Sequence, residues 1–129
     1  MANPAVNRPE GLLDRLVPTA YGEEGPGAWS EAIRAEEREM ADRMVRLADL
    51  MVAGTPPSDP AVLDEIAWYH RAANQYLGID AATFAAIGDA LTEDEQTRAV
   101  FDDVVEGLAA YQRDAMVAYA EARLSMEGA

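Results

Sequence analysis

Apolar side chains recur every three or four residues along most of this chain of 129 residues. That period places them on one face of an α-helix and leaves the other face to polar residues. In the first such stretch the apolar positions are Trp29, Ile33, Met40, Met44, Leu47 and Met51. Gly54 and the pair Pro56–Pro57 end the pattern, because glycine favours helix termini and proline prevents the helix from resuming. The pattern predicts a long helix over residues 29–53, with a charged outer face.

Residues that cap helices mark the start of the next two elements. Asp59 followed by Pro60 predicts a second helix that runs to about Leu77, where a glycine ends it. Asp80 predicts the cap of a third helix over residues 81–91.

Two more helices are expected towards the C-terminus. The stretch TEDE at 92–95 has the form of a capping box, so we expect a fourth helix from Glu93. A bend at Glu106–Gly107 precedes a fifth helix that extends to about Leu124. The inward row of that helix is Leu108, Tyr111, Ala115, Tyr119 and Ala122. Because the sequence lacks sustained alternation of apolar and polar residues, it predicts an all-α domain of about five helices.

The first 27 residues do not follow the helical pattern, since prolines and glycines interrupt them repeatedly. We expect residues 1–27 to form a flexible N-terminal arm with one helical turn around Leu12–Val17. A single helical domain then follows over residues 28–129. The arm carries enough apolar side chains to dock onto another surface.

Charge and composition limit the classes of function. The chain has ten basic residues, all of them arginine, against 24 acidic residues, and its net charge is −14. Such a surface repels nucleic acid and anionic membranes. The sequence contains no apolar run long enough to span a bilayer and no signal peptide, so we expect a cytoplasmic protein. The absence of cysteine excludes disulfides and thiol nucleophiles.

The stretch AWYHRAANQYLGID at 67–80 concentrates aromatic residues and the single histidine of the chain. His70 lies on the apolar face of the second helix, with Trp68 and Tyr69 on its two flanks and Tyr76 beyond Tyr69. One interpretation is a core histidine whose ring is satisfied by a backbone carbonyl or a carboxylate. The other is that these aromatic rings form the wall of a binding site or an interface.

Metal, cofactor and catalytic sites are not expected. Asp64 and Glu65 precede His70 by six and five residues, which does not match the Glu-x-x-His spacing of di-iron bundles. One histidine without cysteine is a poor donor set for zinc or another transition metal, and we expect no haem on His70. The sequence has no glycine-rich phosphate loop, and two of its three serines stand at helix starts, where capping explains them.

Residues 69–120, YHRAANQYLGIDAATFAAIGDALTEDEQTRAVFDDVVEGLAAYQRDAMVAYA, resemble the antibiotic-recognition domain of the TipA-type regulators, the TipAS family. GLAAYQRDAMVAYA at 107–120 is the strongest local match. His70–Arg71, Gly88–Asp89 and Asp94–Glu95 also fit the family pattern, and the resemblance covers about residues 28–125.

This resemblance implies an all-helical, globin-like domain that binds large hydrophobic peptide-like antibiotics such as thiopeptides or albicidin. It also implies that a segment ahead of the long helix folds over the bound drug. The chain lacks the MerR-type DNA-binding module found in many members, so it resembles the stand-alone form. Some thiopeptide-binding members carry a cysteine near the stretch equivalent to 77–86, which here reads LGIDAATFAA. Capture of a ligand is therefore expected to be non-covalent, without catalysis.

We thus expect sequestration or sensing of a hydrophobic natural product, in which aromatic rings stack on the ligand while His70 and Asn74 orient it. The candidate pocket residues are Trp68, Tyr69, His70, Asn74, Tyr76, Phe84 and Tyr111. The candidate lid residues are Leu13, Val17 and Tyr21. The alternative is a protein-interaction module, or a homodimer formed through a face that carries Met40, Met44 and Met51.

Overall fold

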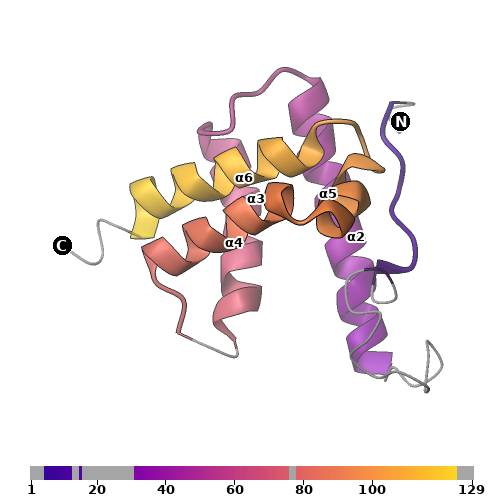
Figure 1. Ribbon diagram of the computed structural model, residues 1–129, viewed down its shortest axis with the longest axis horizontal. Helices are drawn as coiled ribbons and strands as arrows, with labels where there is room; N and C mark the ends of the chain where they lie inside the picture. Colours follow the sequence, from indigo (N-terminus) through magenta and orange to yellow (C-terminus); the bar gives the residue numbers. More distant parts are fainter. Residues whose placement is uncertain (1–4, 13–14, 16–30, 76–77, 125–129) are drawn as a thin grey trace.

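The computed structural model describes residues 5–12, 15, 31–75 and 78–124 (Figure 1). Every regular element in this part of the chain is helical, which confirms the all-α expectation. The elements are α2 (Glu31–Val52), α3 (Pro60–Asn74), α4 (Ala81–Glu93), α5 (Glu95–Asp102), α6 (Leu108–Tyr119) and the π-helix η3 (Ala120–Leu124). None of these helices is long and apolar enough to cross a membrane.

Side-chain caps explain where three of the helices begin. Asp59 accepts a hydrogen bond from Ala61 N at 2.9 Å, and Asp80 accepts one from Thr83 N at 2.8 Å, as the sequence predicts. The expected capping box at 92–95 is wrong in its register. Asp94 caps α5 by accepting from Thr97 N, so this helix begins at Glu95 instead of Glu93.

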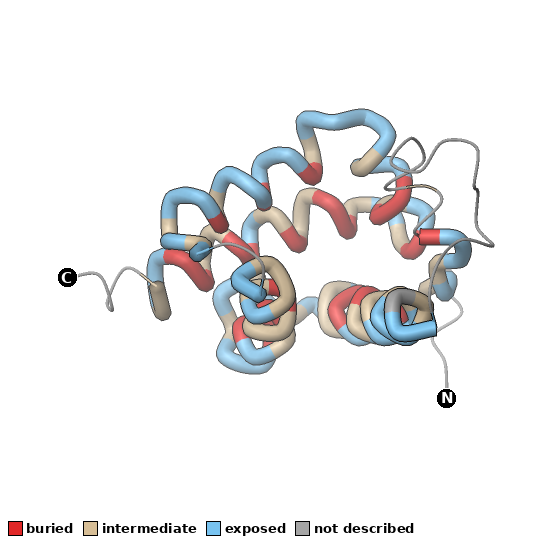
Figure 2. The backbone as a smooth tube through the Cα atoms, turned by 90° about the horizontal axis from the view of Figure 1, so that it is seen from below, coloured by how far each residue is buried: buried red, intermediate tan, exposed pale blue. Residues whose placement is uncertain are grey.

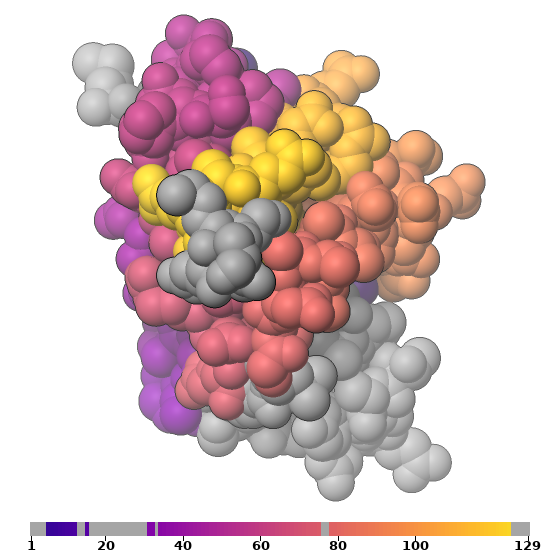
Figure 3. Space-filling view, turned by 90° about the vertical axis from the view of Figure 1, so that its left-hand side faces the viewer, coloured from indigo at the N-terminus to yellow at the C-terminus, as the bar shows by residue number. Residues whose placement is uncertain are grey.

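The helices form two layers that cross each other. Figures 1 and 2 show α4 and α6 side by side, lying across the α2–α3 pair, with the buried residues facing the space between the layers. The C-terminal end of α6, followed by η3, lies between the α2–α3 connection and α4 (Figure 3). Every described helix therefore contributes buried residues to the core.

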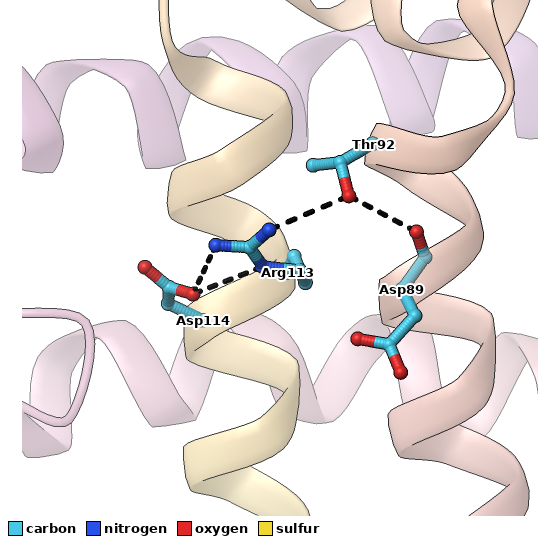
Figure 4. Close-up of polar contacts among 4 residues, drawn as sticks. All are labelled: Asp89, Thr92, Arg113 and Asp114. Carbon is cyan, nitrogen blue, oxygen red and sulfur yellow. Dashed lines mark hydrogen bonds and ion pairs between the residues drawn. The ribbon is translucent and has the colours of Figure 1, made fainter.

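Close contact between α4 and α6 depends on Gly88. A Cβ atom at this position would lie 3.2 Å from Met116 Cβ and 3.4 Å from Arg113 O. Polar contacts complete the joint, since Arg113 donates to the Thr92 hydroxyl at 3.4 Å and Thr92 donates to the Asp89 carbonyl at 3.1 Å (Figure 4).

The described part of the N-terminal segment is attached to the helical body. Asn7 N donates to Val104 O at 2.7 Å, Arg8 pairs with Asp42 on α2, and the Leu12 side chain is 2% exposed. Arg15 N donates to Gly11 O, as expected for the predicted helical turn. Leu12 therefore belongs to the core, and Val6 packs against it.

The inward row predicted for the last helix differs from the structure at its end. Leu108, Ala115 and Tyr119 are buried and Tyr111 is half-buried, whereas Ala122 is exposed. The helix changes to π geometry at Ala120, so its residues beyond that point are rotated away from the α-helical row.

The methionines proposed as a dimerisation face belong largely to the interior. Met44 is fully buried, and Met40 and Met51 pack against the core. Met44 is therefore committed to packing within the domain, whereas Met40 and Met51 are half-buried.

Candidate ligand-binding site

Helix α3 carries three rings of the 67–80 stretch, those of Trp68, Tyr69 and His70, and it separates them into two groups. His70 faces Phe84 on α4 and Tyr119 on α6, whereas Trp68 lies beside Arg43 on α2. The division arises because α3 is covered by different helices on different sides. The residues expected to line one pocket are thus spread over two environments.

The His70 group is a packed aromatic cluster. The His70 ring lies 5.1 Å from the Phe84 ring at an interplanar angle of 88°, and 5.7 Å from the Tyr119 ring. Its Nε2 lies 3.1 Å from the Ile79 carbonyl and donates to it, which is the backbone partner expected of a core histidine. Phe84 is fully buried. This cluster joins α3, α4 and α6.

Asn74 links the His70 cluster to the connection between α3 and α4. Its Oδ1 accepts a hydrogen bond from Ile79 N at 2.8 Å, so His70 and Asn74 together hold both backbone groups of Ile79. These two polar groups, expected to orient a ligand, are used within the protein.

The second group lies between α3 and α2. The Trp68 and Tyr69 rings are 5.1 Å apart and perpendicular, and the Arg43 guanidinium lies 5.8 Å from the centre of the Trp68 ring. Arg43 Nη1 also lies 3.4 Å from Glu65 Oε1, and its Nη2 lies 3.6 Å from Glu39 Oε1. Trp68 is only half-buried, so one part of its ring borders solvent.

Tyr69 is buried, and its hydroxyl has no hydrogen-bond partner among the described residues. Burial raises the pKa of Tyr69 strongly, Glu65 raises it further, and Arg43 acts in the opposite direction. The hydroxyl is therefore protonated at neutral pH and keeps an unused donor. An unpaired polar group of this kind has an energetic cost, because it has lost its water without gaining a partner.

A shallow cavity of about 390 Å³, largely open to solvent, lies between α2 and α3. Its lining residues are Arg46, Asp49, Leu50, Ala61 and Glu65. None of the seven pocket residues predicted from the sequence is among them. Glu65 lines this cavity and also pairs with Arg43, which lies beside the Trp68 ring.

The remaining candidates lie elsewhere. Tyr111 is a half-buried residue of α6, and its hydroxyl donates to the carbonyl of Thr55, in the connection between α2 and α3, at 2.6 Å. Tyr76, Leu13, Val17 and Tyr21 lie outside the described residues.

Arg43 and Arg46 belong to the charged outer face predicted for the first helix, and the sequence pattern did not indicate that Arg46 lines a cavity or that Arg43 contacts α3. A signal was available in the short connection at residues 53–59, which makes α2 and α3 antiparallel neighbours. Because the helices are antiparallel, positions 50, 46 and 43 of α2 lie opposite positions 61, 65 and 68 of α3, in that order. Charge pairing between Arg43 and Glu65 follows from that alignment.

The described part of the chain contains no cluster of three or more histidine, aspartate or glutamate side chains placed to hold a metal ion. The open cavity between α2 and α3 instead offers charges of both signs beside Leu50 and Ala61, and the half-buried Trp68 lies on the same side of α3 as Arg43. Such a mixture suits reversible binding of a ligand that is partly aromatic and partly polar.

Comparison with known proteins gives one finding. A family described as "TipAS antibiotic-recognition domain" matches residues 27–119. No curated protein and no solved structure matches the chain significantly. The matched region contains all of α2 to α6.

Proposed function

The chain belongs to the family of TipAS antibiotic-recognition domains, and on that premise we propose that it binds a large, hydrophobic, peptide-like natural product such as a thiopeptide or albicidin. The family match over residues 27–119 is the observation that carries this proposal. Binding without further reaction would sequester the compound or sense it.

Three features support this class of ligand. Trp68 is half-buried, and a flat heteroaromatic ring that stacks on an indole gains about 0.5–1.5 kcal/mol beyond burial. The neighbouring cavity has an apolar part in Leu50 and Ala61. Its charged residues supply the few polar contacts that orient ligands in mostly apolar sites.

The binding is proposed to be non-covalent. The sequence has no cysteine that could attack an electrophilic group of a thiopeptide. The described residues also present no metal cluster that could activate water. A compound held by stacking and hydrogen bonds dissociates unchanged.

We propose in addition that the segment with Leu13, Val17 and Tyr21 covers the bound compound. Ordering such a segment on binding costs about 2–5 kcal/mol of the gross interaction. Burial of its apolar side chains against the ligand offsets that cost. The anchored Leu12 holds the start of this segment against the body.

The direct test is a fluorescence titration of the W29F variant, in which Trp68 is the remaining tryptophan. Addition of a thiopeptide or albicidin is expected to change the Trp68 emission in a saturable way at or below tens of micromolar. Intact-protein mass spectrometry after incubation is expected to show unchanged masses of protein and compound. No response to either compound at those concentrations would refute the proposed function, and a mass change would refute its non-covalent character.

The rival proposal, a homodimer formed through Met40, Met44 and Met51, receives no support from the packing, since Met44 is fully buried. Light scattering that gives the mass of a dimer would favour it, if Trp68 is also protected from fluorescence quenchers in that dimer.

A further inference from the structure

We propose that the N-terminal strap, defined as residues 5–12 and 15, opens as a unit while the helices α2 to α6 stay folded. The strap lies along α2 and the α5–α6 connection (Figure 1). Its opening exposes the part of the core that Leu12 covers. This inference goes beyond the proposed function, because it concerns a conformational change of the protein without a ligand.

A single apolar side chain anchors the strap. Leu12 is 2% exposed and is the buried residue among those described in the strap, while Val6 packs against the core. The chain turns at Gly11, where φ is +63°, a conformation that glycine adopts without strain. Arg15 N then donates to Gly11 O at 3.0 Å. Because this hydrogen bond lies within the strap, the turn that carries Leu12 can leave the body in one piece.

Hydrogen bonds join the strap to α5 and to the connection that follows it. Asn7 N donates to Val104 O at 2.7 Å, and Asn7 Nδ2 donates to Asp103 O at 3.1 Å. Gln96 Nε2 donates to Arg15 O at 3.1 Å. Asn7, Asp103 and Gln96 are exposed, so water can replace these partners when the strap leaves. Opening therefore avoids most of the cost of leaving polar groups unpaired.

Two ion pairs complete the attachment, and both face solvent. Arg8 pairs with Asp42 on α2, where the two side chains are 51% and 55% exposed. Arg15 pairs with Asp103 at 2.7 Å, where they are 36% and 64% exposed. Exposed pairs of this kind contribute little to stability and are screened by salt. The closed state of the strap is therefore expected to weaken as the ionic strength rises.

The helical body keeps its own core when the strap opens. The other buried apolar side chains, among them Leu47, Val62 and Phe84, belong to the helices and their connections. Segments with few buried contacts open at a lower free energy than the whole domain. The strap, with its one buried side chain, is such a segment.

Single cysteines can report the opening, because the chain contains none of its own. L12C places a thiol in the strap, and V62C places one at a fully buried position of α3 as the matched control. Both variants react with iodoacetamide, an uncharged reagent whose approach does not depend on salt, at urea concentrations below the unfolding midpoint. Intact-protein mass spectrometry measures the rates.

We expect L12C to react at least about tenfold faster than V62C. The L12C rate should depend little on urea, whereas the V62C rate should rise steeply, since a urea dependence scales with the surface exposed on opening. Equal rates with the same urea dependence would show that the strap leaves only when the whole domain unfolds, and the proposal would be wrong.

The electrostatic part of the attachment has its own pair of variants. In the L12C background, R8A is expected to speed the reaction about twofold to threefold, as is a rise in KCl from about 0.05 M to about 0.5 M. R71A removes an exposed arginine of α3, which is not among the described contacts of the strap, and is expected to leave the rate unchanged. Equal effects of R8A and R71A would contradict the assigned role of the Arg8–Asp42 pair.

Hydrogen exchange followed by NMR tests the unchanged protein, so the outcome does not depend on the folding of any variant. The Asn7 amide is expected to be protected, and to exchange with a smaller urea dependence than the Ile66 amide in the middle of α3. An unprotected Asn7 amide would show that the strap is not docked. An Asn7 amide that exchanges only with Ile66 would show that it does not open separately. Either result would overturn the proposal.

Discussion

Gly88 limits how closely α4 and α6 approach each other. The absence of a side chain leaves room for Met116 Cβ and the Arg113 carbonyl oxygen. Neither atom can move by rotation of a side chain, because the first is bonded to the backbone and the second belongs to it. The α4–α6 joint also carries the polar contacts of Arg113 and Thr92 (Figure 4). A single methyl group at this position is thus a sensitive probe of the packing.

We predict that G88A lowers the free energy of unfolding by about 1 kcal/mol. Overpacking costs about 1–3 kcal/mol, and the better helix propensity of alanine returns up to about 1 kcal/mol. Urea denaturation checks the value. G78A serves as the control, because an added Cβ there meets nothing within 4 Å. A stabilised G88A protein would show that α4 and α6 are less tightly packed than described.

The carboxylates that cap helices also titrate, and Asp94 gives a testable case. The Thr97 hydroxyl and the Thr97 backbone N–H donate to Asp94 and lower its pKa below the usual value. Because the pKa in the folded protein is lower than in the unfolded chain, the cap stabilises fully above about pH 4. The stabilisation is lost as the pH falls through the folded-state pKa.

We therefore predict that D94A melts at a lower temperature than the unchanged protein at pH 7, and that this difference shrinks as the pH falls below about 4. Melting curves recorded from pH 7 to pH 2.5 measure it. D89A is the matched control, since the Asp89 side chain caps no helix. A difference that stays constant across this range would contradict the assigned role of the Asp94 carboxylate.

At the scale of elements, periodicity was sufficient to find the helices from Glu31 onwards, and the caps Asp59 and Asp80 were identified correctly. The start of α5 was misplaced because Thr92 and Asp94 are both suitable caps. The Thr92 hydroxyl instead bonds back to Asp89 within α4. The π-helix that follows α6 has no distinctive sequence pattern, so the orientation of Ala122 could not be predicted.

The site was predicted less well than the helices, for a physical reason. A pattern on one helix shows which residues are apolar, but the neighbouring helices decide whether a ring becomes core or wall. Phe84 of α4 is fully buried against His70 of α3 and Tyr119 of α6, whereas Trp68 is half-buried beside Arg43 of α2. The contributions of Arg46 and Asp49 depend on that pairing and could not be read from α2 alone.

Gly107 illustrates how an element boundary is fixed by backbone conformation. Its φ is +94°, and α6 begins there without a side-chain cap. We predict that G107A destabilises the protein by about 1–2 kcal/mol, because an L side chain is strained in the left-handed region and its Cβ would lie 3.1 Å from Met51 Cε. Guanidinium denaturation measures this loss. An unchanged midpoint would mean that the α5–α6 turn adapts at no cost.

At the scale of the whole molecule, the N-terminal segment connects elements that are distant in sequence. Asn7 bonds to Val104, Arg8 pairs with Asp42 on α2, and Arg15 pairs with Asp103 at 2.7 Å. Surface ion pairs contribute little, so Leu12 is expected to supply most of the attachment. This anchoring holds the described residues 5–12 against the helical body.

We predict that L12A lowers the free energy of unfolding by about 2–5 kcal/mol, as expected for a fully buried leucine. I87A, which truncates an exposed side chain on α4, is expected to change it by less than about 0.5 kcal/mol. Chemical denaturation of both variants gives the comparison. Equal, small effects would show that the segment is detached from the core in solution.

The central claim, reversible binding of an amphipathic peptide-like compound by this helical domain, is tested most directly by isothermal titration calorimetry with a thiopeptide and with albicidin at two temperatures. The account predicts saturable binding of at least one compound and a negative heat-capacity change, because apolar surface of the ligand is buried. The absence of saturable binding by either compound at tens of micromolar protein would contradict it.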